Sequence, residues 1–249
     1  MERSAARFSF KEALAQLPRG APLGMEVLAA HGITSKRASA LVRSGWLLRL
    51  GRGAYGLPGD TLQRDACLAV LAQQVPGLHV AGKTALAWRG VRHNLAFRET
   101  VVLWGDQPAR LPHWLDGVVA VRYRVAHIFD ADLPAGLGLA PLAGGHPDLP
   151  VSTPERALLE LLSETGSFEG LEEVRQLVES TRNLRCRQLD QLLGHLTRIK
   201  VARLAARLAS ELELPWADLA QRHSRRLGGG RRWVAVGRIG ERLDLAATP

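Results

Sequence analysis

The sequence predicts an α+β protein, with an N-terminal winged helix-turn-helix followed by a larger mixed α/β C-terminal domain. The first 60 residues read in the order helix, helix, turn, helix and hairpin, which is typical of a winged helix. Strand-like apolar runs and then several amphipathic helices follow, which indicates a second domain containing both kinds of element. We therefore expect a DNA-binding domain over 1–60 and an α+β domain over 61–249. Within the second domain we expect a strand-rich part over 61–150, a helical part over 151–215 and a terminal hairpin over 228–249.

Three helices and a hairpin account for the N-terminal domain. The sequence pattern predicts helices over residues 8–17, 24–31 and 35–44. Gly32 breaks the pattern between the second and third helices, and Thr34 or Ser35 can cap the third. Gly45 ends the third helix. The apolar runs on either side of Gly51-Arg52-Gly53 then predict a β-hairpin with a glycine-supplied turn.

The third helix has two unlike faces. Ala38, Leu41 and Val42 fall on one side, where they would pack on the first two helices. The other side is small, polar and cationic, as expected of a helix that enters a DNA groove and reaches phosphates and base edges. The predicted DNA-binding residues on this helix and on the hairpin are Thr34, Ser35, Lys36, Arg37, Ser39, Arg43, Arg49 and Arg52. Trp46 and Tyr55 are expected to pack in the domain rather than stack on bases. The alternative is that the cations only solvate an exposed helix.

The C-terminal domain begins with a helix over 61–75 and strands between residues 78 and 128, interrupted by a short helix at 84–90. Residues 130–150 are rich in Pro, Gly and Asp and predict a loop or a boundary between domains. Ser152-Thr153-Pro154-Glu155 then opens a strong helix, with a hydroxyl cap and a proline in the first turn. Further helices are expected to about Leu214.

Length and composition limit the function classes. A chain of 249 residues with 46% hydrophobic content is long enough for two folded domains. Every apolar run falls short of the ~18–20 residues of a membrane span, and residues 1–20 lack the apolar core of a signal peptide. Cys67 and Cys186 lie far apart and read as free thiols. We expect a cytoplasmic protein with no membrane association.

The formal charge of +9 is unevenly distributed. Residues 1–60 carry a net +5, residues 61–180 a net −4 and residues 181–249 a net +8. Segregated positive charge creates surfaces that attract phosphate, which favours a nucleic-acid partner. The alternative is that the 29 arginines reflect genomic base composition rather than a binding surface.

A second basic face is predicted near the C-terminus. On a helix over 200–212, apolar residues such as Val201, Leu204 and Leu208 form a stripe, and basic residues line its flank. The residues of the second basic face are Arg198, Lys200, Arg203, Arg207, Arg231 and Arg232. This face could bind nucleic acid or an acidic protein surface, or the helix could simply pack on its core with solvated arginines.

Residues 77–84, GLHVAGKT, match the Walker A phosphate-loop pattern, and Asp106 could imitate a magnesium ligand. A phosphate loop follows directly on a buried strand, whereas here Gln73-Gln74-Val75-Pro76 precedes it. The apolar residues at 78–81 look like a strand inside the loop. We therefore interpret the match as fortuitous and expect no nucleotide cofactor. Metalloprotease, serine-hydrolase and cysteine-pair motifs are missing from the sequence, and the eight histidines lack ligand spacing, so neither an enzyme nor a metal site is expected.

Several segments together resemble the AbiEi-type antitoxins, the transcriptional regulators of type IV abortive-infection toxin–antitoxin systems. They are RLGRGAYGLP, TALAWRGV, STPERALLELLSE, TRNLRCRQLDQLL, IKVARLAARLASELELPWADL and LGGGRRWVAVGRIGERLDLAAT. The resemblance covers nearly the whole chain. Ala81-Gly82-Lys83 departs from the family's usual polar residues, and VGRIG, with Arg238, replaces its lysine-rich hairpin.

The resemblance implies two activities. The winged helix would bind inverted repeats in double-stranded promoter DNA and repress its own operon, as a dimer or cooperatively. The C-terminal domain would neutralise a nucleotidyltransferase-like toxin, directly or indirectly, in phage defence. Two alternatives are a P-loop NTPase coupled to DNA binding and a general nucleic-acid-binding protein.

Overall fold

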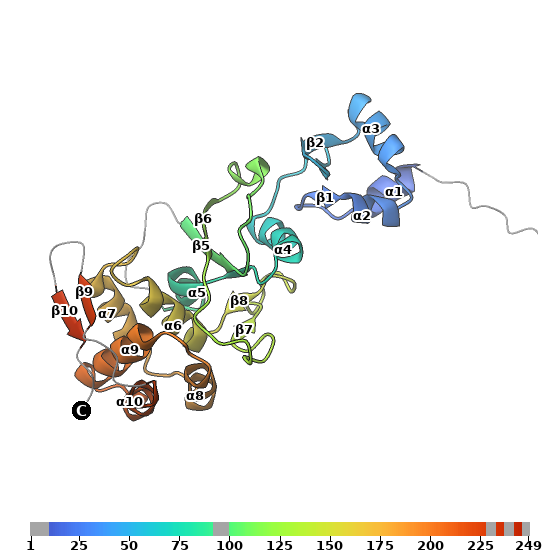
Figure 1. The fold of residues 1–249 in the computed structure, drawn as a ribbon. Helices are drawn as coiled ribbons and strands as arrows, with labels where there is room; N and C mark the ends of the chain where they lie inside the picture. Colours follow the sequence, from blue (N-terminus) through green and yellow to red (C-terminus); the bar gives the residue numbers. More distant parts are fainter. Residues whose placement is uncertain (1–9, 92–99, 228–232, 237–241, 246–249) are drawn as a thin grey trace, which may run out of the picture. The chain divides into compact units, whose positions relative to one another are not determined.

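The computed structural model describes residues 10–91, 100–227, 233–236 and 242–245 (Figure 1). The chain divides into two compact units. The N-terminal unit comprises Met1–Gln74 and Ala109–Ala120, and the C-terminal unit comprises Val75–Pro108 and Val121–Pro249. The N-terminal unit thus includes helix α4 (Arg64–Gln74) and the short 3-10 helix η1 (His113–Leu115) in addition to the winged helix.

The N-terminal unit has the predicted order of elements. Its remaining helices and strands are α1 (Phe10–Gln16), β1 (Leu23–Gly24), α2 (Met25–Ala30), α3 (Ser35–Arg43), β2 (Leu48–Gly51) and β3 (Ala54–Gly56). The three predicted helices and the hairpin are confirmed. Strand β1, which the sequence did not predict, pairs with β3 and completes an antiparallel sheet of order β1-β3-β2. A two-residue strand is too short to show the alternation that identifies a strand in sequence.

One apolar core joins the helices to the hairpin of the N-terminal unit. Its buried residues are Ala13, Leu17, Leu23, Leu28, Ile33, Ala38, Leu47, Tyr55 and Leu57. Leu41 and Val42 pack against this core, as the helical periodicity predicted. Because Ala38 of α3 and Tyr55 of β3 belong to the same core, the third helix and the hairpin are held on one framework.

The turn before α3 is set by local chemistry. Gly32 has a φ of +73°, a conformation that favours glycine, and the Ile33 amide donates to the Leu28 carbonyl over 2.9 Å. Thr34 is the N-cap, and its hydroxyl accepts a hydrogen bond from the Arg37 amide at 3.4 Å. These contacts fix where α3 begins and therefore which of its residues face the core.

The C-terminal unit contains a mixed five-stranded sheet of order β6-β5-β4-β8-β7. Its strands are β4 (His79–Val80), β5 (Thr100–Gly105), β6 (Ala120–Val125), β7 (Leu139–Ala140) and β8 (Val151–Ser152). Strand β4 is antiparallel to β5 and parallel to β8, with Val80 opposite Val151. The segment 130–150, predicted as a loop or a boundary between domains, contains the short strand β7, which pairs with β8 although its neighbours are turn residues.

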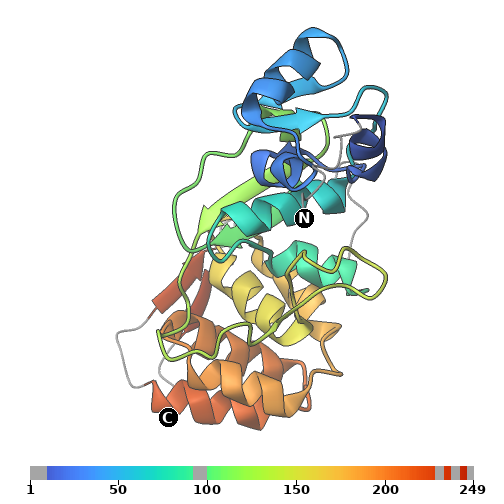
Figure 2. The same ribbon diagram turned by 90° about the vertical axis from the view of Figure 1, so that its right-hand side faces the viewer.

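Six helices of the C-terminal unit are described, and they pack mainly around α6 and α9 (Figure 2). They are α5 (Gly82–Trp88), α6 (Pro154–Glu164), α7 (Leu171–Glu179), α8 (Cys186–Gly194), α9 (Ile199–Glu211) and α10 (Ala217–Arg226). The predicted helix at Pro154 is confirmed with Thr153 as N-cap, but the predicted hydroxyl cap is wrong, since the Thr153 side chain forms no cap hydrogen bond with a helix amide. Strands β9 (Trp233–Val236) and β10 (Arg242–Leu245) form the predicted terminal hairpin. Across the described residues, every helix is too short or too polar to cross a bilayer.

Candidate nucleic-acid interface

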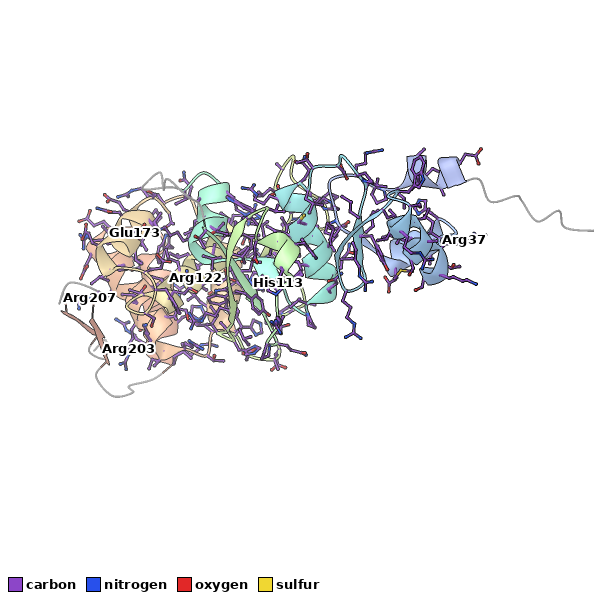
Figure 3. All side chains as sticks on the ribbon, turned by 90° about the horizontal axis from the view of Figure 1, so that it is seen from above. Arg37, His113, Arg122, Glu173, Arg203 and Arg207 are labelled. Atoms are coloured by element: carbon purple, nitrogen blue, oxygen red, sulfur yellow. The ribbon has the colours of Figure 1, made fainter. Side chains whose placement is uncertain are left out.

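The outward face of α3 carries the predicted residues. Every predicted DNA-binding residue between Thr34 and Arg43 is exposed, whereas Ala38 on the opposite side is fully buried. Arg37 is labelled on this helix in Figure 3. The small side chains Ser39 and Ala40 lie between the longer cations, so the face has no bulky apolar group that would hold it away from a groove.

Two hydrogen bonds arrange the polar side chains at the start of α3. The Arg37 guanidinium donates to the Gly32 carbonyl at 3.0 Å, so the side chain lies back over the turn that precedes the helix. The Ser39 hydroxyl donates to the Ser35 carbonyl at 3.0 Å. The first turn of α3 thus combines a placed guanidinium with the backbone amides of a helix N-terminus, both of which suit a phosphate oxygen.

The hairpin adds two exposed cations. Arg49 lies in β2 and Arg52 in the β2–β3 turn, and both side chains are exposed. Gly53 has a φ of +71°, so the turn depends on a residue without a side chain. Residues 27–59 contain five Lys and Arg and no Asp or Glu. The helix and hairpin therefore present positive charge without a neutralising carboxylate from their own segment.

The two aromatic residues that follow α3, Trp46 and Tyr55, differ in burial. Tyr55 is buried in the core, as predicted, but the prediction that Trp46 packs inside the domain is wrong, since its side chain is 52% exposed. The neighbouring Leu48 is 48% exposed, and the buried residue between them is Leu47. The run Trp46-Leu47-Leu48 is apolar throughout, so the sequence gives no sign of which residue faces inward.

The segment that resembles a phosphate loop has another structure. Strand β4 lies inside it, and the Gly82 amide donates to the Glu160 carboxylate at 2.9 Å. Lys83 forms ion pairs with Glu169 and Glu173, and the buried Thr84 hydroxyl accepts from the Val102 amide at 3.0 Å. The groups that would cradle phosphate in a Walker A loop are thus used within the fold.

Glu160 is the centre of a buried polar cluster that sequence reasoning missed. Its side chain is fully buried and accepts hydrogen bonds from His79 at 3.0 Å, Ser152 at 2.8 Å and Arg156 at 2.9 Å. Burial alone would raise the pKa of Glu160, but His79, Arg156 and the Gly82 amide together lower it below its usual value. The cluster joins β4, β8, α5 and α6 and has the character of an internal structural element.

A second ionic cluster lies at the end of α6, where Figure 3 labels Arg122 of β6. The buried Glu164 accepts from the Trp104 indole at 3.1 Å, from Arg122 at 2.8 Å and from Arg124 at 3.3 Å. Both guanidiniums also lie over the exposed Phe168 ring, at 4.6 Å and 5.3 Å from its centroid. The cluster connects strands β5 and β6 to helix α6.

The second basic face is not a uniform exposed surface. Arg203 is only 3% exposed, so its place on that face is wrong; α9 packs against α6, α7, α10 and β10, which together leave little of it exposed. Arg198 donates to the Ser163 hydroxyl at 3.4 Å, Lys200 to the Thr165 carbonyl at 2.7 Å and Arg207 to Glu211 at 2.7 Å. Burial, with Arg198 and Arg124 nearby, lowers the pKa of Lys200 to about 8. Arg231 and Arg232 lie outside the described residues.

Among the described residues, no group of three His, Cys, Asp or Glu side chains is placed to hold a metal ion. In the N-terminal unit, the exposed, cationic face of α3 and the cationic hairpin share one core. Such an arrangement can hold phosphates with its cations and place short polar side chains against base edges.

Comparison with known proteins agrees with this geometry. Residues 7–97 match the model of the transcriptional regulator, AbiEi antitoxin N-terminal domain, and residues 98–244 match that of the transcriptional regulator, AbiEi antitoxin, type IV TA system. No curated protein sequence matches the chain significantly. The crystal structure of the RV2827C protein from Mycobacterium tuberculosis shares the fold, with a TM-score of 0.57 and 20% identity over 89% of this chain and 80% of that chain. Since the two family models together span nearly the whole sequence, the chain belongs to the AbiEi antitoxins, the transcriptional regulators of type IV toxin–antitoxin systems.

Proposed function

We propose that the protein is a sequence-specific repressor of its own operon and the antitoxin of a nucleotidyltransferase-like toxin. Residues 1–60 bind inverted repeats in double-stranded promoter DNA, and residues 61–249 neutralise the toxin, directly or indirectly. The observation that carries the DNA-binding half is the exposed cationic face of α3, which shares one core with the cationic hairpin. The antitoxin half rests on membership of the family.

The two sets of exposed side chains would do different work. Lys36, Arg43, Arg49 and Arg52 displace counterions from phosphates and supply most of the affinity. Thr34, Ser35, Arg37 and Ser39, at the start of α3, contact base edges and neighbouring phosphates. One copy of α3 reads one half-site, so an inverted repeat takes two copies of the chain.

The second basic face, without Arg203, is a candidate binding surface of the C-terminal unit. Arg198 and Arg207 keep exposed or half-exposed side chains on the C-terminal unit, whereas Arg203 does not. We propose that Arg198, Lys200 and Arg207, with Arg231 and Arg232, meet an acidic toxin surface or additional phosphates.

Binding to the protein's own promoter tests the DNA-binding half. Full-length protein is titrated with the duplex from upstream of its gene, with a scrambled duplex and with RNA, at physiological salt. We expect the promoter to bind at least 10³-fold more tightly than the scrambled duplex, the usual lower range for specific binding. Equal affinity for all three would instead identify a general nucleic-acid-binding protein.

Two further measurements separate the rival functions. If the chain were a P-loop NTPase, wild type would bind ATP or GTP and Lys83→Ala would lose that binding; we expect wild type to bind neither. For the antitoxin half, full-length protein and residues 61–249 are each co-expressed with the nucleotidyltransferase encoded beside the gene. Rescue of growth by both would assign antitoxicity to the C-terminal domain, and failure of the full-length protein would exclude the antitoxin function for that toxin.

A further inference from the structure

Two large apolar side chains are exposed next to the candidate DNA-reading helix. Of the described residues, four large hydrophobic side chains are exposed, and two of these, Trp46 at 52% and Leu48 at 48%, lie two positions apart after α3. Apolar groups of this size usually lie in a core, and neighbouring exposed ones mark a contact surface more often than a scattered single residue does.

The backbone holds this pair in place. Gly45, with a φ of +75°, turns the chain at the end of α3, and the amides of Trp46 and Leu47 both donate to the Leu41 carbonyl, at 2.9 Å and 3.2 Å. Leu47 is buried in the core, whereas the residues on either side of it are exposed. Hydrogen bonds to the end of α3 therefore hold the backbone that carries Trp46 and Leu48.

The charges around the pair indicate what covers it. Arg43 lies three residues before Trp46, Arg49 follows Leu48, and both are exposed. Because residues 27–59 contain no carboxylate, a symmetric dimer that paired this patch with the same patch of a second copy would bring like charges together. A polyanion with apolar groups between its phosphates is complementary to an apolar pair with a cationic border. Duplex DNA has that character, since its grooves expose deoxyribose carbons and thymine methyl groups between phosphates.

We propose that Trp46 and Leu48 form an apolar contact with duplex DNA, next to the phosphates held by Arg43 and Arg49. This inference rests on the proposed DNA binding. It adds an aromatic and an aliphatic side chain to an interface that otherwise consists of cationic and small polar ones. The flat indole covers a large area with few rotatable bonds, so it contributes apolar contact at a low entropic cost. Its position directly after α3 allows it to sense groove shape or the thymine methyl group beside the bases that α3 reads.

An apolar contact and a phosphate contact respond differently to salt. A cation bound to phosphate releases counterions, so its loss makes the plot of log affinity against log salt shallower by about one unit. An apolar contact releases no counterions. Removing Trp46 should therefore weaken DNA binding by a similar factor at every salt concentration and leave the slope unchanged.

The experiment titrates full-length wild type, Trp46→Ala, Trp46→Phe, Leu48→Ser and Arg43→Ala with the promoter duplex at four or more salt concentrations. We expect Trp46→Ala to bind roughly tenfold more weakly with the wild-type slope, and Trp46→Phe to recover part of the loss. Arg43→Ala is the matched control and should lower the slope by about one. Since the Trp46 side chain is half exposed, all variants should melt near wild type by circular dichroism. If Trp46→Ala alone does not fold, Leu48→Ser is the deciding variant.

Three results would overturn the proposal. The first is an unchanged promoter affinity in both Trp46→Ala and Leu48→Ser. The second is a fall of the salt slope equal to that of Arg43→Ala, which would mean a lost phosphate contact. The third is a wild-type dimer in the absence of DNA that Trp46→Ala converts to a monomer in analytical ultracentrifugation, which would assign the patch to a second copy. If wild type binds no duplex at all, the proposed DNA-binding function fails first, and that result is distinguishable from the other three.

Discussion

Glu160 gathers its hydrogen-bond partners from four elements: His79 in β4, the Gly82 amide in α5, Ser152 in β8 and Arg156 in α6. A buried carboxylate costs free energy unless it is well paired, and here every partner stabilises the ionised form. The position of this one side chain therefore depends on the correct packing of sheet and helices together.

Glu160→Gln should destabilise the C-terminal unit by about 3–5 kcal/mol, because it leaves the buried His79 and the partly buried Arg156 without the carboxylate that both contact. Chemical denaturation followed by circular dichroism measures the loss. Glu172→Gln, at an exposed position of α7, is the matched control and should change stability little. A Glu160→Gln variant as stable as wild type would show that the cluster contributes nothing to stability.

The same residue gives a pH dependence with a definite sign. The pKa of Glu160 is lower in the folded protein than the usual value, so the unfolded chain binds its proton more readily. Its contribution to stability is therefore present above the unfolded pKa, roughly 4.3, and is lost as the pH falls through the lower folded pKa. Melting temperature between pH 7 and pH 3 should fall more steeply for wild type than for Glu160→Gln, and parallel curves would contradict the assignment.

The two cysteines differ in thiol reactivity because one side chain is buried and the other is exposed. Cys67 is buried in α4, and burial raises the pKa of its thiol to about 11, whereas Cys186 is exposed at the start of α8. Since the thiolate is the reactive form, native protein should react quickly with a thiol reagent at one position and denatured protein at two. Mass spectrometry after brief labelling identifies the position, and fast labelling of Cys67 in native protein would contradict its burial.

At the scale of the element, α3 shows how one helix serves fold and surface together. Ala38 is fully buried with Leu41 and Val42 packed beside it, while the cations lie on the other side. The Thr34 cap determines where the helix begins, and so which residues lie on which side. Without the cap, the first turn and its polar side chains would be less well ordered.

Thr34→Ala should therefore destabilise the N-terminal unit by about 0.5–1 kcal/mol, the lower part of the range for lost caps, because its hydrogen bond is long and exposed. Thermal unfolding without DNA measures the change, so that a lost phosphate contact does not contribute. Thr34→Ser keeps the hydroxyl and should retain most of the wild-type stability. If the serine variant lost as much stability as the alanine variant, the side-chain cap would not be the cause.

At the scale of the whole molecule, the N-terminal unit is built from two separate stretches of chain. Residues Ala109–Ala120 belong to it, and η1 within this stretch packs against β2 of the hairpin. Leu115 of η1 is buried. A segment some 60 residues away in sequence therefore supports the strand that carries Arg49.

Leu115→Ala should make the hairpin less stable, because it removes a buried side chain from the segment that supports β2; such truncations cost about 2–5 kcal/mol. Hydrogen exchange in the full-length protein checks this expectation. Amides of β2 and β3 should exchange faster than in wild type, while amides of α9 should be unchanged. Faster exchange in α9 alone would contradict the assignment of this stretch to the N-terminal unit.

The sequence by itself determined most helices, both hairpins and the amphipathic character of α3, because these depend on local periodicity, glycine turns and caps. It also determined the family, through motifs spread over nearly the whole chain. The sequence pattern did not predict two-residue strands such as β1 and β7, because they form only by pairing with strands distant in sequence. Only the tertiary structure decided that Trp46 is exposed while Leu47 is buried, and that Arg203 of α9 is buried. The physical reason is the same in each case: burial is decided by the neighbours that the fold brings together, and a side chain's type gives only a preference.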